Sequence, residues 1–261
     1  MGQSKAMRFF QILYPICIYF VVTTVVLSLL DFVMPDSSGV KLFRQMISSL
    51  ASLPFLYVFY RDDQVMRGKW DGRVKIRLPQ FSVSMLFLLL LTGACASVFL
   101  NNLLGILRIT EYSASYAQVE ETFYRGRLAF ELLALCVVIP VAEELLYRGI
   151  VYGRSRDLFG VRGGVVFSAV IFGLIHMNLA QFVYAAVFGL LLAYLTELTD
   201  NLFYAAAVHM AANTVSVLRA ETELFAFAKH QWGFIALTVG SGAVAAAGIY
   251  FFLVRQNQNA K

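Results

Sequence analysis

Charged residues and histidines are scarce in this chain of 261 residues. Asp, Glu, Lys and Arg together make up 14% of it, there are 3 histidines, and hydrophobic residues account for 59%. An ordinary soluble domain has roughly 25% charged residues. The composition therefore excludes such a domain and predicts an integral membrane protein.

Motifs for nucleotides, redox chemistry and structural metals are also missing. No GxGxxG or Walker-type glycine loop occurs, which argues against nucleotide-driven transport by this chain alone. The 3 cysteines, Cys17, Cys95 and Cys136, lie far apart in apolar stretches without a CxxC pair. They are predicted to be small buried hydrophobic residues and not a redox or zinc-binding set.

The chain contains several long apolar runs. A helix needs about 20 residues to cross the hydrocarbon core of a bilayer. Runs near that length are predicted at 9–30, 43–60, 81–107, 128–147, 164–177, 180–198, 203–218 and 232–254. The predicted fold is an all-α, polytopic bundle of about eight transmembrane helices.

The distribution of Lys and Arg predicts the orientation of this bundle. Basic residues gather in the segments 61–80 and 148–163, and cytoplasmic loops carry such an excess. Both termini are therefore expected in the cytoplasm. The first run has no cleavage site of small residues after it, so it is predicted to be a retained anchor, with the protein in the cell membrane. The net charge of +5 is explained by the basic residues in the predicted cytoplasmic segments. It therefore does not indicate a nucleic-acid partner, and none is expected.

Three regions are predicted along the chain. Residues 1–127 form membrane scaffold helices, 128–218 form a core that carries the polar residues, and 219–261 form a last membrane helix with a short cytoplasmic tail. The longest polar segments, 61–80 and 108–127, are too short for a soluble domain. Any chemistry is therefore expected in or beside the bilayer.

An ionisable cluster ends the fourth apolar run, where Glu143, Glu144 and Arg148 stand close together. A charge near the bilayer centre costs on the order of 3 kcal/mol, so such a cluster indicates a functional site. Adjacent helical residues point about 100° apart. Glu144 is therefore predicted to pair with Arg148, and Glu143 to face a cavity together with Tyr147. An ordinary ion pair at the membrane interface is the alternative interpretation.

Two of the histidines lie in or near later apolar runs. Phe172 precedes His176 by one helical turn and is predicted to pack against its ring. His209 and Asn213 share one helical face, so both side chains point into the bundle together. They could act on a substrate, or they could form a structural polar clamp between helices.

These residues form three motifs in a fixed order. They are EExxxR at Glu143, Glu144 and Arg148, FxxxH at Phe172 and His176, and HxxxN at His209 and Asn213. In this order they resemble the CPBP group of intramembrane proteases. That group contains the type II CAAX prenyl endopeptidases and the ABI proteins of bacteriocin processing and immunity.

The resemblance implies an endopeptidase that hydrolyses a peptide bond of a membrane-delivered peptide or protein, in CAAX-type or leader and bacteriocin-type processing. Glu143 and His176 would activate a water, His209 and Asn213 would hold the oxyanion, and Glu144 and Arg148 would support them. No cofactor is required in this scheme. Zinc held by Glu143, His176 and His209, with water as fourth ligand, is a possible variant.

The partners that follow are a membrane-associated peptide or protein substrate and the lipid bilayer, while the oligomeric state is not predicted. Two other functions are kept open. One is a non-catalytic ABI-type bacteriocin-immunity or membrane scaffold protein. The other is a proton-coupled transporter, against which the lack of an internal repeat and of paired broken helices argues.

If each apolar run is placed as one straight membrane span, Glu143 and His176 come to lie at different depths. This placement puts Glu143 near the cytoplasmic face, whereas His176 lies about 18 Å along its own helix, and residues that share a water must be within hydrogen-bond reach. We therefore predict that the fourth helix continues past Arg148 toward Leu158, that Gly160 ends it, and that Glu143 lies deeper than hydropathy indicates.

Overall fold

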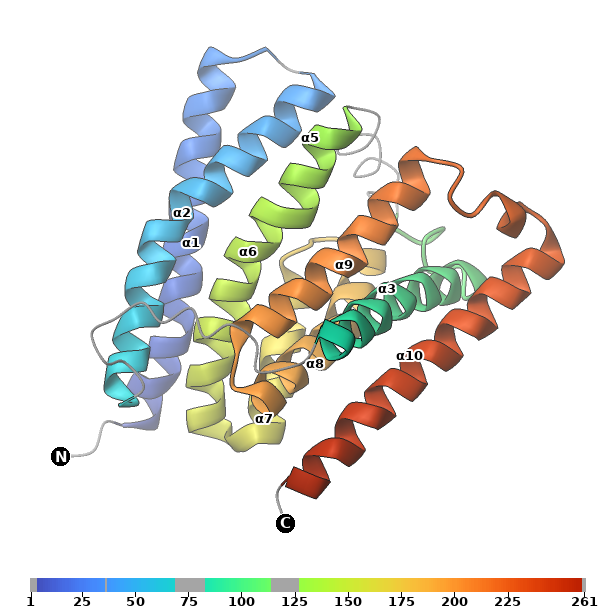
Figure 1. Ribbon diagram of the computed structural model, residues 1–261. Helices are drawn as coiled ribbons and strands as arrows, with labels where there is room; N and C mark the ends of the chain where they lie inside the picture. The colour runs from blue at the N-terminus through green and yellow to red at the C-terminus, as the bar shows by residue number, and fades with distance from the viewer. Residues whose placement is uncertain (1–3, 36, 69–82, 114–126, 260–261) are drawn as a thin grey trace.

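The computed structural model describes residues 4–35, 37–68, 83–113 and 127–259, which are helical apart from short connections. The elements are α1 (Lys5–Val33), α2 (Ser38–Met66), α3 (Val83–Ile106), α5 (Leu128–Leu133), η1 (Ala134–Val138), α6 (Ile139–Glu144), η2 (Leu145–Tyr152), α7 (Gly153–Leu174), α8 (Leu179–Thr199), α9 (Leu202–Glu221), η3 (Ala226–Lys229) and α10 (Gln231–Asn259). Figure 1 shows α1 and α2 along one side, the segment from α5 to α7 in the middle, and α3 and α10 on the opposite side.

Helices of spanning length confirm that this is a membrane protein. Among the described residues, five helices are long and apolar enough to cross a bilayer, namely Lys5–Val33, Gly39–Met66, Val83–Ile106, Leu179–Thr199 and Gln231–Val254. The other three predicted runs also fall on helical segments. The run 128–147 is divided among the short elements α5, η1, α6 and η2, and α7 and α9 lack an apolar stretch of spanning length. The count of eight spans therefore stays a prediction.

Both ends of the chain lie at the lower end of the view in Figure 1. Which side of a membrane this end faces stays a prediction, as does the cytoplasmic position of the basic segments. Much of the segment 61–80, from residue 69 on, and much of 108–127 lie outside the described residues.

A single long helix with a sharp break forms the centre of the fold. It runs from Leu128 through η1, α6 and η2 into the first turns of α7, where Gly160 has φ 74° and ψ 175°. This conformation is essentially restricted to glycine. The prediction that the helix continues toward Leu158 and ends at Gly160 is thus confirmed.

Beyond Gly160 the second arm of α7 returns beside the first, and we call residues 128–174 the central hairpin. The Ser168 hydroxyl donates to the backbone carbonyl of Tyr147 across a distance of 2.9 Å. A Cβ at Gly164 would lie 2.7 Å from Cα of Arg156, so the arms also touch near the bend. Because the arms are antiparallel, Glu143 on the first arm lies at the level of Phe172 on the second.

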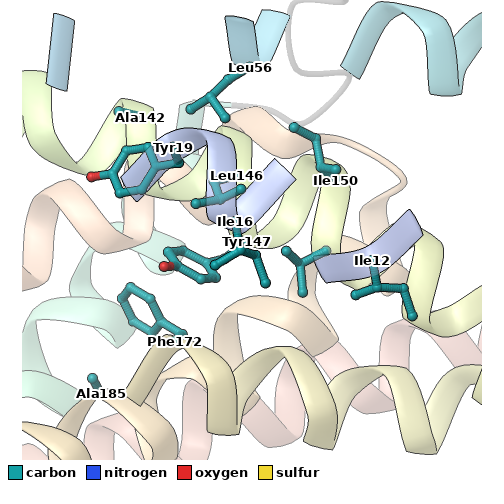
Figure 2. Packing of buried hydrophobic residues seen from close by; sticks show 11 residues of the cluster. Ile12, Ile16, Tyr19, Leu56, Ala142, Leu146, Tyr147, Ile150, Phe172 and Ala185 are labelled. Carbon is teal, nitrogen blue, oxygen red and sulfur yellow. The ribbon is translucent and has the colours of Figure 1, made fainter. Parts of the chain in front are cut away.

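A buried apolar cluster packs α1 and α2 against the central hairpin (Figure 2). It comprises Ile12, Ile16, Tyr19, Leu56, Ala142, Leu146, Tyr147, Ile150, Val151, Phe172 and Ala185. In a bilayer, such packing stabilises helix association through van der Waals contacts. The cluster therefore holds the first arm of the hairpin in a fixed position.

Small residues bring α3 close to α9 and α10 on the other side of the bundle. A Cβ at Gly93 would lie 2.7 Å from Cγ1 of Val208, and a Cβ at Gly248 would overlap the side chain of Thr92. Small residues at such contacts let membrane helices approach closely. This packing positions α9, which carries His209 and Asn213.

The cysteines differ from one another in burial. Cys136 is buried and Cys95 is half-buried, but Cys17 is exposed on α1. The prediction of three buried cysteines is therefore wrong for Cys17. Its helix is covered by neighbours on one side only, so an apolar residue there does not have to be buried within the protein.

Candidate active site

Glu143 and Glu144 lie in the short α-helical stretch α6, between two π-helical turns, η1 and η2. Such wide turns inside α-helices are frequent at functional sites. Glu144 pairs with Arg148, as predicted, but both carboxylates also lie near His209, Glu144 at Nδ1 and Glu143 at Nε2. That Glu143 faces a cavity stays a prediction. Glu144 is buried, whereas 14% of the Glu143 side chain is exposed.

Glu144 accepts from two donors at once. Its Oε1 atom lies 2.8 Å from Nη1 of Arg148 and 2.8 Å from Nδ1 of His209. Both side chains of the Glu144–Arg148 pair are 0% exposed. The pair is therefore buried within the bundle and is not an exposed surface ion pair, while its depth in the membrane stays a prediction.

The contact between Glu144 and His209 was not predicted from the sequence. The two residues are 65 positions apart, and no spacing rule links helices α6 and α9. A carboxylate oxygen can only accept, so the contact assigns a ring hydrogen to Nδ1 of His209. Glu144 thereby fixes the orientation of the His209 ring.

Arg148 packs against the ring of Phe172 on the second arm of the hairpin. Its guanidinium carbon lies 4.2 Å from the ring centroid, which is a cation–π contact. Gly189 of α8 leaves room beside it, since a Cβ there would lie 3.3 Å from Nη2 of Arg148. The absence of a side chain at Gly189 thus helps a full arginine to fit inside the bundle.

Phe172 also contacts both site histidines edge-on. Its centroid lies 5.3 Å from that of His176, with an interplanar angle of 90°, and 5.7 Å from that of His209, at 83°. The predicted packing of Phe172 against His176 is therefore confirmed. One aromatic ring positions Arg148, His176 and His209 together.

The backbone fixes which nitrogen of His176 carries the ring hydrogen. Nδ1 lies 2.9 Å from the carbonyl oxygen of Phe172. Because a carbonyl can only accept, Nδ1 carries the ring hydrogen, and Nε2 is left with a lone pair in the neutral ring. His176 can therefore accept a proton at Nε2.

Glu143 lies among these groups without a direct hydrogen bond from the histidines. Its Oε2 atom is 3.8 Å from Nε2 of His209, which is too long for a hydrogen bond. Glu143 also acts electrostatically on His176 and Tyr147. The structure thus gathers the predicted residues Glu143, His176 and His209 in one place.

Asn213 is directed to a backbone group instead. Its Nδ2 atom donates to the carbonyl of Leu135 in η1 over 2.8 Å. The N–H of Ile139 bonds to the carbonyl of Ala134 in this π-helical turn, so the next donor in the series would be residue 140. Pro140 has no N–H. Asn213 therefore acts as the polar clamp that the sequence left open, and its role at an oxyanion stays a prediction.

A metal ion would need several donor side chains grouped around it. Within the described part of the chain, no three His, Cys, Asp or Glu side chains are grouped so that they could hold a metal ion. Zinc at Glu143, His176 and His209 stays a prediction.

The fold and this centre define a helical membrane protein with carboxylates and histidines gathered inside its bundle. Residues 125–215 match the family model described as type II CAAX prenyl endopeptidase Rce1-like. The matched stretch contains every motif residue from Glu143 to Asn213, and it confirms the resemblance to the CPBP group over these positions. No curated protein and no solved structure matches the chain.

Proposed function

We propose that this protein is an intramembrane endopeptidase of the cell membrane that hydrolyses a peptide bond in a membrane-delivered peptide or protein. One observation carries the proposal: the partly exposed carboxylate of Glu143 lies 3.8 Å from His209 and acts electrostatically on His176, and the Nδ1 atoms of both histidines are already engaged. The family match supports a CAAX-type substrate, and leader or bacteriocin-type processing uses the same chemistry.

The first step is the activation of water. Glu143 and Nε2 of His176 accept a proton from a water that attacks the scissile carbonyl, as a general base does when it lies within hydrogen-bond reach. The proton then passes to the amine of the departing fragment, and the new carboxylate leaves with the other fragment. This route needs no cofactor.

The second requirement is a donor for the oxyanion. Nε2 of His209 can donate only when the ring carries a second hydrogen. Glu143 and Glu144 bring two negative charges and Arg148 one positive charge, so an imidazolium at His209 makes the cluster neutral. Preorganised donors of this kind contribute roughly 3 kcal/mol each to the stabilisation of a transition state.

The test is a comparison of peptide termini, by mass spectrometry, in membranes of host cells that carry wild type or Glu143→Gln at equal abundance. We expect termini that depend on Glu143, which would identify the substrate at the same time. Glu131→Gln is the matched control, because Glu131 is buried in α5, earlier on the same helix and outside the site. This variant should leave the termini unchanged.

Two results would contradict the endopeptidase function and assign another function. Bacteriocin immunity that survives Glu143→Gln, without any Glu143-dependent terminus, would assign the immunity or scaffold function. Proton flux that is stimulated by a solute and abolished by Glu143→Gln would assign the transporter.

A further inference from the structure

The hydroxyl group of Tyr147 is buried without a hydrogen-bond partner. The residue is 0% exposed, and its ring packs on Phe172 with centroids 5.1 Å apart. Among the described residues, no atom accepts from or donates to its oxygen. An unpaired buried hydroxyl lowers stability, and phenylalanine would fill the same space without this cost. Folding alone therefore does not account for the hydroxyl.

The groups around this hydroxyl identify an acceptor for it. Tyr19, Glu143 and Arg148 act electrostatically on Tyr147. Arg148 can only donate, and the hydroxyl of Tyr19 has Ser49 beside it. Figure 2 shows the hydroxyls of Tyr19 and Tyr147 pointing to the same side of the cluster. Glu143 is thus the one anionic acceptor in the group that surrounds Tyr147.

A carboxylate oxygen of Glu143 can accept a hydrogen bond from Tyr147. It stands four residues before Tyr147, so the two side chains leave the same side of the helix. Its closest ionic neighbour is His209, at 3.8 Å, and the side chain keeps 14% of its surface exposed. A carboxylate has about four acceptor positions, and a general base works best when one oxygen is held and the other faces the water.

We propose that Tyr147 is a positioning residue for Glu143. During turnover its hydroxyl donates to one carboxylate oxygen of Glu143, and the second oxygen then faces the hydrolytic water. A small rotation of the Glu143 side chain makes this contact, because the tyrosine is fixed by the apolar cluster around it. The inference rests on the proposed function and adds a residue that none of the three sequence motifs includes.

The test uses the full-length protein in lipid nanodiscs, with the peptide identified through its Glu143-dependent terminus. Tyr147→Phe should lower kcat by about tenfold or more, because a hydrogen bond to a charged group is lost. KM should stay within about twofold, since Tyr147 does not contact the peptide in this proposal. The Tm should equal or exceed that of wild type, because the unpaired hydroxyl is gone.

Tyr184→Phe is the matched control, since it removes a hydroxyl that is paired and lies apart from the carboxylates. The Tyr184 hydroxyl donates to Oγ of Ser97 over 2.8 Å. This variant should lower Tm and leave kcat close to that of wild type. Opposite changes in the two variants would separate a catalytic effect from a structural one.

Three results would overturn the inference. Wild-type kcat in Tyr147→Phe, while Glu143→Gln is inactive, would reject the role of Tyr147 and leave the proposed function standing. A lower Tm with unchanged kcat per folded molecule would assign Tyr147 a structural role. Full cleavage by Glu143→Gln would reject the proposed function, and the inference with it.

Discussion

His209 is held by Glu144 through a contact of 2.8 Å between Nδ1 and Oε1. Glu144 is at the same time the counterion of Arg148, at 2.8 Å. One carboxylate oxygen therefore accepts from both Arg148 and His209 inside the bundle. Any change at Glu144 should affect both the charge balance of the core and the orientation of the histidine.

Glu144→Gln should separate these two effects when it is combined with a second substitution. Alone, it leaves Arg148 buried without a counterion, and we expect a loss of about 3–5 kcal/mol in the free energy of unfolding. Arg148→Met in the same chain removes the unpaired charge and should restore most of this stability. Cleavage should stay at least about a hundredfold below wild type in both variants, because His209 is no longer oriented. Thermal unfolding and cleavage rates measure the two effects, and an active double variant would contradict the positioning of His209 by Glu144.

Asn213→Ala should destabilise the protein through the carbonyl of Leu135. The cost of an unpaired buried carbonyl is about 1–3 kcal/mol. Pro140→Ala restores an N–H at the position from which this carbonyl can be reached, so Asn213→Ala should cost less in that background. The free energies of unfolding of the two single variants and the double variant form a cycle that measures this coupling.

Cleavage by the same variants tests the second role of Asn213. If its amide also stabilises an oxyanion, activity should stay about a hundredfold or more below wild type when stability is restored by Pro140→Ala. Recovery of cleavage in the double variant would limit Asn213 to the clamp between α9 and η1.

Phe172→Leu should lower both stability and kcat. The substitution removes a cation–π contact with Arg148, of about 0.5–2 kcal/mol, and the edge contacts with His176 and His209. Phe188→Leu is the control, because Phe188 contacts His209 alone among these residues, with centroids 6.2 Å apart. A loss of kcat as large in the control as in Phe172→Leu would contradict a shared positioning role of Phe172.

Gly160→Ala should weaken the bend of the central hairpin. A side chain in this conformation costs of the order of 1–3 kcal/mol, so Tm should fall, and cleavage should fall with it as the two arms move apart. Gly240→Ala is the control, because a Cβ at Gly240 of α10 would meet nothing within 4 Å. Its Tm should equal or exceed that of wild type, since alanine favours the helix.

The local parts of this fold could be predicted from the sequence. The apolar runs, the pairing of Glu144 with Arg148, the packing of Phe172 on His176 and the break at Gly160 all depend on residues near each other in the chain. Helical periodicity and the backbone freedom of glycine are enough to predict such features.

The contacts between distant helices could not be predicted in the same way. The link from Glu144 to His209 depends on how α9 packs beside α6, and the bond from Asn213 to Leu135 depends on a π-helical turn. The spacing of residues along the chain predicts neither of these two contacts. Cys17 shows the same limit, because apolarity alone does not distinguish a residue inside the bundle from one on its surface.

The bend at Gly160 also has a consequence for how the protein is made. Glu143 and Glu144 emerge from the ribosome on the same hairpin as Arg148, His176 follows directly after this hairpin, and His209 follows two helices later. The nascent hairpin therefore enters the bilayer with one ion pair complete and one glutamate unmatched. Until α9 is synthesised and packs beside α6, the chain lacks the histidine ring that lies 2.8 Å from Glu144 and 3.8 Å from Glu143.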